Sequence, residues 1–139
     1  MLPPQEKETN DNLIDISTGT PLESEKGRDK LLHLMDSNLK SVFRSYLIQL
    51  MAIIIRWKLQ PTKRNRKMLV QIVNLRIELN ILREECSFIN KEYIAAIWDR
   101  SYADALKVVS AETGIRNIGI PQIGFEDIFE NEFVYTKLN

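Results

Sequence analysis

The chain has 139 residues, 44% of them hydrophobic and 27% charged, which is the length and composition of one small globular domain. Its 19 basic and 19 acidic residues leave no net charge, and its single cysteine excludes an internal disulfide. One cysteine and one histidine, Cys86 and His33, cannot build a Cys/His zinc site, so neither a metal nor a cofactor is expected.

The zero net charge conceals a strong asymmetry along the chain. Residues 30–83 contain eleven Lys or Arg and two acids, a net charge of +9, whereas residues 1–29 sum to −4 and residues 84–139 to −5. The same central segment is the most apolar part of the chain. A segment that is both basic and apolar predicts helices that pack in a core and carry a charged rim.

Residues 1–27 are predicted to form a polar acidic tail that is disordered or depends on a partner for its structure. Leu13, Ile14 and Ile16 are its apolar exception and could form a short docking segment. The first residues contain no apolar run, so we expect no conventional signal peptide and predict a cytoplasmic location. Residues 28–139 are predicted to form the helical bundle domain.

The first long helix is expected over residues 29–59, with Asp29 as its N-cap. One helical stripe carries Leu39, Val42, Tyr46, Leu50, Ile53 and Trp57. Between Tyr46 and Ile55 the helix is apolar on nearly all sides, which predicts either the centre of the bundle or an oligomer interface. This run is far shorter than the roughly 20 residues of a membrane-spanning helix, so no membrane span is predicted.

Three further helices follow. Pro61 ends the first helix, and a second over residues 62–85 should run antiparallel to it because the junction is short. A third helix is expected over residues 90–113, ended by Gly114, and a short acidic helix over residues 125–131 should pack its phenylalanines on the bundle. Strand content should be near zero. The predicted fold class is therefore all-α: three long helices in a bundle, with a short C-terminal helix.

Several motifs carry a family resemblance. They are Arg56-Trp57-Lys58-Leu59-Gln60-Pro61, Arg64, Arg66, Ile72, Arg76, Tyr102-Ala103-Asp104-Ala105, Ala111-Glu112-Thr113-Gly114, Pro121 and Phe125-Glu126. Over about residues 30–134 the chain resembles the mostly bacterial domain-of-unknown-function family numbered twenty-nine. The resemblance implies an all-helical fold and no known activity. The chain departs from that family at residues 30–33, where a run of glutamates is missing, and at Ile53, where the family usually has histidine.

Six basic residues are the candidate binding site. They are Arg56, Lys58, Lys63, Arg64, Arg66 and Lys67. The run from Lys63 onward lies at the start of the second predicted helix, where the helix dipole favours acids instead. Two explanations are open. The cluster binds an acidic partner or a nucleic-acid backbone, or it is neutralised within the chain by the acidic C-terminal helix, which carries Glu126, Asp127, Glu130 and Glu132.

The acidic residues form no catalytic pattern. Glu84 and Glu85 are adjacent and point to different helix faces, and Asp99 and Asp104 are poorly aligned. No catalytic residue is predicted, and the chain is not expected to be an enzyme.

Other side chains receive structural interpretations. Arg76 and Arg83 share a helix face, and Glu112 is their candidate partner. Trp57 is expected in the core, with a cation–π pair to Arg56 or Lys58 as the alternative. Trp98 and Tyr102 are also expected in the core.

The predicted function is a non-catalytic helical interaction module. It would bind a protein partner or itself through the apolar first long helix and the basic corner of the hairpin. The alternative is a nucleic-acid-binding accessory subunit that uses the basic cluster at residues 56–67. The overall isoelectric point of about 6.6 weighs against this alternative, because nucleic-acid-binding domains usually lie above about 9.

Overall fold

The computed structural model describes residues 21–116 and 123–135, with side chains from residue 27 onward. Its helices are α2 (Pro21–Leu59), α3 (Arg66–Glu85), α4 (Lys91–Thr113) and α5 (Phe125–Phe129), and a 3-10 turn, η1, spans Pro61–Lys63. The described residues include no strand, which confirms the all-α prediction. The expected docking segment at Leu13–Ile16 and the turn at Pro121 lie outside the described residues.

The chain divides into two compact units, residues 1–38 and 39–139. In the first unit the described element is the N-terminal part of α2, which begins at Pro21 rather than at the predicted Asp29. Proline suits a first helical turn because the amide hydrogen that it lacks would have no partner there. The predicted tail boundary at residue 27 therefore lies inside a helix.

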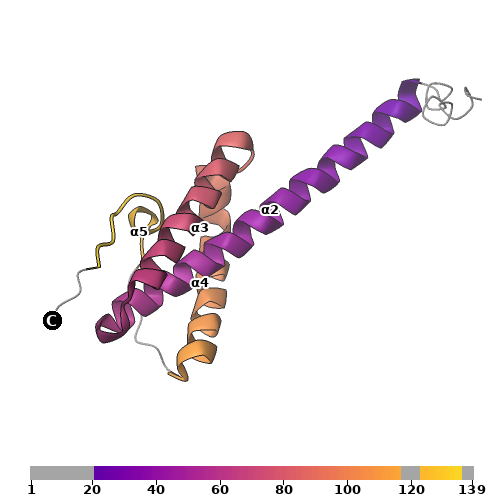
Figure 1. Cartoon of the computed structure of the whole chain (residues 1–139). Coiled ribbons are helices and arrows are strands. Elements are labelled where there is room, and N and C mark those ends of the chain that lie inside the picture. Colours follow the sequence, from indigo (N-terminus) through magenta and orange to yellow (C-terminus); the bar gives the residue numbers. More distant parts are fainter. Residues whose placement is uncertain (1–20, 117–122, 136–139) are drawn as a thin grey trace, which may run out of the picture. The chain divides into compact units, whose positions relative to one another are not determined.

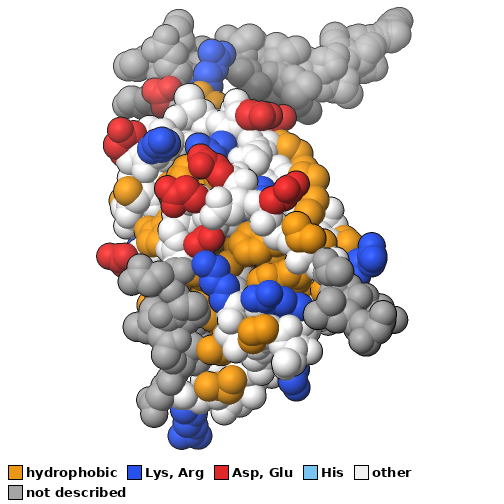
Figure 2. Space-filling model, turned by 90° about the vertical axis from the view of Figure 1, so that its left-hand side faces the viewer, with side chains coloured by type: hydrophobic (Ala, Val, Ile, Leu, Met, Phe, Trp, Pro, Cys, Tyr) orange, Lys and Arg blue, Asp and Glu red, His pale blue; other side chains and the backbone are white. Residues whose placement is uncertain are grey.

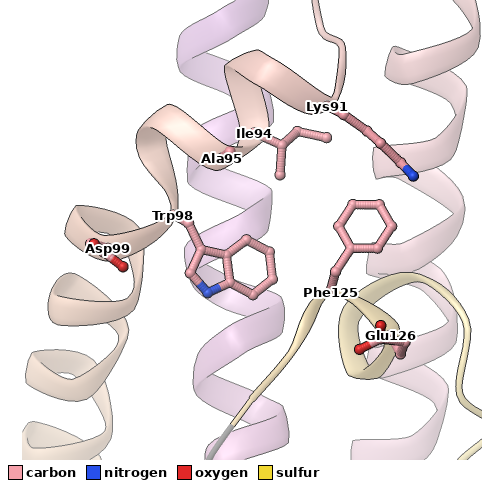
Figure 3. Close-up of a pocket in the computed structure, with 7 residues that line it drawn as sticks. All are labelled: Lys91, Ile94, Ala95, Trp98, Asp99, Phe125 and Glu126. Atoms are coloured by element: carbon pink, nitrogen blue, oxygen red, sulfur yellow. The ribbon is translucent and has the colours of Figure 1, made fainter.

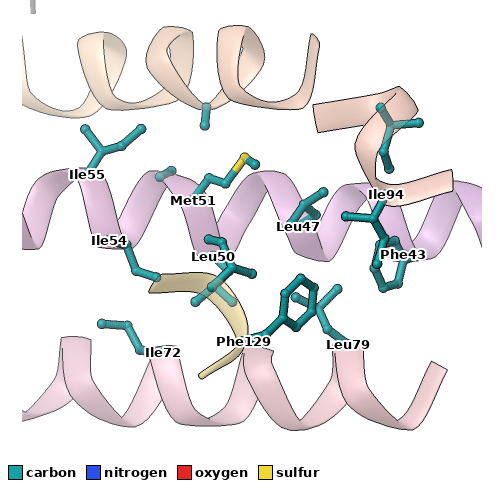
Figure 4. Close-up of a cluster of buried hydrophobic side chains, with 14 of the residues drawn as sticks. Phe43, Leu47, Leu50, Met51, Ile54, Ile55, Ile72, Leu79, Ile94 and Phe129 are labelled. Atoms are coloured by element: carbon teal, nitrogen blue, oxygen red, sulfur yellow. The ribbon is translucent and has the colours of Figure 1, made fainter. Parts of the chain in front are cut away.

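The core of the second unit is built around the C-terminal half of α2. Its side chains Phe43, Leu47, Leu50, Met51, Ile54 and Ile55 are fully buried. Figure 4 shows α2 between α3 and α4, with Phe129 of α5 reaching the same cluster. The sequence left open whether residues 46–55 form the centre of the bundle or an oligomer interface. In the structure they form the centre of the bundle.

The predicted stripe on this helix is partly wrong. Val42 is 41% exposed, whereas its neighbour Phe43 is fully buried, and Tyr46 and Ile53 are only half-buried. A helix covered on several sides buries more than one stripe, so a single periodic series could not locate the most buried line of side chains.

Caps explain where α3 and α4 begin and end. Asn65 and Asn90 accept hydrogen bonds from the backbone N–H groups of Met68 and Tyr93, at 2.8 and 2.9 Å, and so act as N-caps. The helix predicted over 62–85 is therefore η1 followed by α3. Gly114 ends α4 with φ 74°, as predicted, because glycine adopts this left-handed conformation without strain.

The three long helices alternate in direction in the second unit (Figure 1). The connection through η1 is short and turns α3 back along α2, as predicted. Arg44 and Arg56 of α2 pair with Asp104 and Glu112 of α4, so α4 runs in the same direction as α2. α5 is shorter than predicted and ends at Phe129.

Within the part of the chain that the structure describes, one helix is long and apolar enough to cross a membrane, by length and composition alone. It is the part of α2 from Gly27 to Leu59, and 39% of its most apolar 18-residue window is buried within the protein. The core helix of a water-soluble protein passes the same test, so this finding is weak support for a span.

Because Leu50 is fully buried, Leu50→Ala should lower the free energy of unfolding by about 2–5 kcal/mol, through lost burial and the cavity that remains. Leu34→Ala makes the same chemical change at a side chain that is 55% exposed, and should cost less than about 0.5 kcal/mol. Urea unfolding followed by circular dichroism measures both. Equal losses for the two variants would contradict the position of the core.

Candidate functional site

The corner between α2 and α3 is held by Arg64. Its Nε donates to the backbone carbonyl of Trp57 at 2.7 Å, and its guanidinium lies 4.9 Å from the centre of the Trp57 ring. Trp57 is 3% exposed, and the ring of Phe133 meets it edge-on at 6.0 Å. The core prediction for Trp57 is confirmed. The ring also has a cation–π partner, but that partner is Arg64 rather than Arg56 or Lys58.

Two more of the six candidate residues pair with acids of the same chain. Arg56 lies 3.4 Å from Glu112 of α4, and Lys58 lies 3.1 Å from Asp127 of α5. The Arg56 pair is worth at most about 1 kcal/mol, because the Glu112 side chain is 47% exposed. For Lys58 the proposed neutralisation by the acidic C-terminal helix is observed, through Asp127.

Asp127 is the hub of contacts that attach α5. Partial burial would raise the pKa of its carboxyl, but hydrogen bonds from the Gly124 N–H, Lys58 and Asn131 outweigh this and hold the pKa below its ordinary value. Arg76 adds to the attachment by donating to the backbone carbonyls of Asp127 and Ile128, at 2.9 and 2.8 Å. These contacts connect α5 to both α2 and α3.

The prediction that Arg76 and Arg83 pair with Glu112 is wrong. Arg76 is committed to the α5 carbonyls, and the Arg83 guanidinium lies 4.5 Å from the centre of the Phe129 ring. Glu112 instead binds Arg56, because α4 lies along α2 and brings its last turn to the end of that helix. Residue spacing alone could not reveal this neighbour.

The other three candidate residues make none of these contacts, and we call them the uncommitted cations. Lys63, Arg66 and Lys67 are exposed, and within residues 27–116 and 123–135 none of them forms an ion pair. The first turn of α3 contains no acid. Arg66 and Lys67 therefore face the unfavourable end of the helix dipole without local compensation.

Beyond these cations α3 has an apolar outer face. It carries Val70, Val73, Ile77 and Ile81, which are 51%, 47%, 51% and 41% exposed. They lie opposite Ile72 and Leu79, which are buried in the core. Arg66, Leu69, Val70, Val73 and Asn74 line a shallow depression of about 240 Å³ at the basic end of this face. We did not predict this face from the sequence.

Hydrophobic side chains are also exposed on the face of the molecule that Figure 2 shows. Figure 2 shows hydrophobic side chains exposed between a group of acidic and a group of basic side chains. The first long helix has exposed apolar side chains as well. Leu31, Leu32, Leu34 and Met35 are 49–58% exposed.

A larger pocket lies between α4 and α5 (Figure 3). It has a volume of about 550 Å³ and is lined by Lys91, Ile94, Ala95, Trp98, Asp99, Phe125 and Glu126. The rings of Trp98 and Phe125 are stacked at 6.5 Å, and the Lys91 ammonium lies 5.4 Å from the Phe125 centroid. Trp98 and Tyr102 are half-buried and pack against the core without belonging to its buried cluster, so the prediction that both belong to the core is wrong in part.

The remaining acids are not assembled into a metal site within the described residues. Asp104 binds Arg44 at 2.6 Å, and Glu84 and Glu85 are exposed at the end of α3. Cys86 is buried.

The lowered pKa of Asp127 predicts a pH dependence. Asp127→Asn should reduce the free energy of unfolding at neutral pH by about 1 kcal/mol, because it weakens the cap of α5 and the contact with Lys58. The ionised Asp127 carboxylate stabilises the folded chain fully at pH values above the pKa of this group in the unfolded chain, which is near 3.8. This stabilisation is lost as the pH falls through the lower pKa that the group has in the folded chain. The difference between wild type and variant should therefore narrow in acid.

Urea unfolding at a series of pH values measures this difference. Glu132→Gln removes the same charge from an exposed residue and is the control. A difference for Asp127→Asn that stays constant into strong acid would contradict the role assigned to the carboxylate.

Comparisons with known proteins agree with the motifs. No curated protein matches the chain, and no solved structure matches it either. One family model does match, described as "Domain of unknown function DUF29", and the match spans residues 30–134. This range includes the corner at Trp57, the whole of α3 and α4, and α5. Since the match covers well over half of its length, the chain belongs to the DUF29 family.

Proposed function

We propose that this protein is a non-catalytic interaction module whose binding surface is the outer face of α3 together with Lys63, Arg66 and Lys67. The observation that carries the proposal is the line of exposed apolar side chains on a helix whose opposite side is already packed in the core. Exposed apolar side chains that lie together on one face, bordered by charge, are typical of protein interaction sites.

The chemistry of this surface favours an amphipathic helix with acidic residues as the partner. Val70, Val73 and Ile77 would pack against its apolar stripe, and the depression near Val70 has room for an apolar side chain. Arg66 lines that depression, and it and its exposed chain neighbour Lys67 would face acidic residues of the partner.

The surface differs from the one expected around residues 46–55. Leu47, Leu50, Met51, Ile54 and Ile55 have no exposed area left to offer a partner. Of the basic corner, Arg56, Lys58 and Arg64 make contacts within the chain. The outer face of α3 and the three uncommitted cations therefore take the place of both predicted surfaces.

Site-specific photo-crosslinking in the cells that make the protein tests the proposal. A benzophenone amino acid at Val73 should give a covalent adduct with a second polypeptide, because this side chain lies in the proposed interface. The same group at Val108 should give little adduct, because Val108 lies on α4, outside the proposed interface, although its side chain is 37% exposed. If the Val73 position yields no more adduct than Val108, α3 is not a binding surface.

The three uncommitted cations also support nucleic-acid binding as a second candidate function. Three phosphate contacts from Lys63, Arg66 and Lys67 predict a slope of about −2.7 for the logarithm of the affinity for B-DNA against the logarithm of salt concentration. Fluorescence anisotropy with a labelled duplex measures this slope. Reversal of Lys63 and Lys67 to glutamate should abolish binding, whereas reversal of Arg100 and Lys107 on α4 should have a smaller effect. An affinity that does not change with salt would eliminate this candidate.

A further inference from the structure

We infer that the partner of this surface is a second copy of the chain, with the two α3 helices packed antiparallel about a twofold axis. The inference rests on the proposed function, since it uses the same face. It goes further because it names the occupant and the register. Three features of α3 support it independently: the order of residues along the outer stripe, the position of the depression, and the signs of charge at the two ends.

The outer stripe is self-complementary when it is reversed. Lys67, Val70, Asn74, Ile77, Ile81 and Glu84 follow one another at steps of three and four residues, the spacing of a two-helix seam. In an antiparallel pair centred between Leu75 and Arg76, each member of this stripe meets another member. Val70 faces Ile81 of the second copy, Asn74 faces Ile77, and Lys67 faces Glu84. A twofold interface requires this kind of match, in which one patch is complementary to itself.

The depression on α3 supports the same register. It is lined by Arg66, Leu69, Val70, Val73 and Asn74, so it surrounds the position of Val70. The side chain that this register places over Val70 is Ile81 of the second copy. An apolar side chain inserted between neighbouring side chains of the facing helix is how paired helices pack. The twofold axis creates two such insertions, one at each end of the seam.

The charges at the two ends of α3 are opposite in sign, and both oppose the helix dipole. Arg66 and Lys67 lie in the first turn, which contains no acid, and Glu84 and Glu85 lie in the last turn beside one base, Arg83. An antiparallel partner brings Glu84 to Lys67 and Glu85 to Arg66, at both ends of the pair. It thereby gives the two cations of the first turn the acids that this turn lacks, and gives the two glutamates of the last turn cations in addition to Arg83.

Asn74 is the polar residue nearest the axis on this stripe. In the proposed register the two Asn74 side chains lie within about one helical turn of each other across the axis. A polar side chain within an otherwise apolar seam favours the register in which it finds a polar neighbour. Because Ile77 of the second copy stands directly opposite Asn74, the two Asn74 side chains meet only diagonally, and the register rests on the apolar and charged pairs.

Charge exchange across the axis tests the arrangement, with sedimentation equilibrium as the readout. Wild type should dimerise with a dissociation constant in the micromolar range, since one helix face buries less area than about 1,200 Å². Lys67→Glu and Glu84→Lys each place like charges together twice, and each should weaken the dimer roughly tenfold. The double variant, Lys67→Glu with Glu84→Lys, restores opposite charges at both ends and should regain most of the wild-type affinity.

Ile77→Lys places a charge near the axis and should give a monomer at concentrations where wild type is a dimer. Val108→Lys introduces the same charge at an exposed apolar residue of α4 and should leave the dimer intact. Circular dichroism checks that every variant keeps its helices. Residues on the outer face of α3 are exposed, so these substitutions should not unfold the chain.

The outcomes separate this inference from the proposed function. A monomeric wild type would overturn the dimer, while a Val73 crosslink to a different polypeptide would still support an interaction module. Single variants that weaken the dimer without rescue in the double variant would overturn the antiparallel register. A dimer that is indifferent to Ile77→Lys would overturn the use of α3 altogether.

Discussion

The structure depends on the need to cover α2 on several sides. Between Phe43 and Trp57 this helix presents apolar side chains in nearly every direction, and six of them are fully buried. Each fully buried side chain of this size contributes about 1.5–3 kcal/mol relative to exposure. α3 and α4 cover two sides, and α5 is fixed against α2 and α3 by Lys58 and Arg76. The short helix is thus part of the core, since Ile128 is fully buried and Phe129 is 8% exposed.

The cations on the rim of α2 follow from the same arrangement. A helix at the centre of the bundle lies next to every other helix, so acids from α4 and α5 reach Arg44, Arg56 and Lys58. The excess of positive charge in residues 30–83 is therefore partly matched by the acidic segment that follows it. The cations that have no ion pair within the described residues include Lys63 on η1 and Arg66 and Lys67 on α3, a helix that packs on the core with one face only. The proposed interaction surface is thus a consequence of how the core is covered.

Much of the fold could be predicted from local pattern. The periodicity of apolar residues located three long helices, and Pro61 and Gly114 marked two of their ends correctly. The start of α2 at Pro21 and the N-cap of α3 at Asn65 were missed, although proline and asparagine are recognisable helix-start signals. The start of α4 was predicted correctly at Asn90, which is its N-cap. The candidate site was predicted less well. Of six basic residues, Arg56, Lys58 and Arg64 turned out to have partners far away in the chain or across the corner.

The sequence by itself determined the all-helical class, the antiparallel hairpin at Pro61, the family, and the apolar character of the helix at residues 46–55. These properties depend on side-chain periodicity and backbone chemistry over short distances. Only the tertiary structure decided which charges are neutralised and which face of α3 stays open. A pair such as Lys58 and Asp127 depends on how the helices pack. Whether Val70 or Ile72 is covered depends on the side from which a neighbouring helix approaches, and both residues are equally apolar in the sequence.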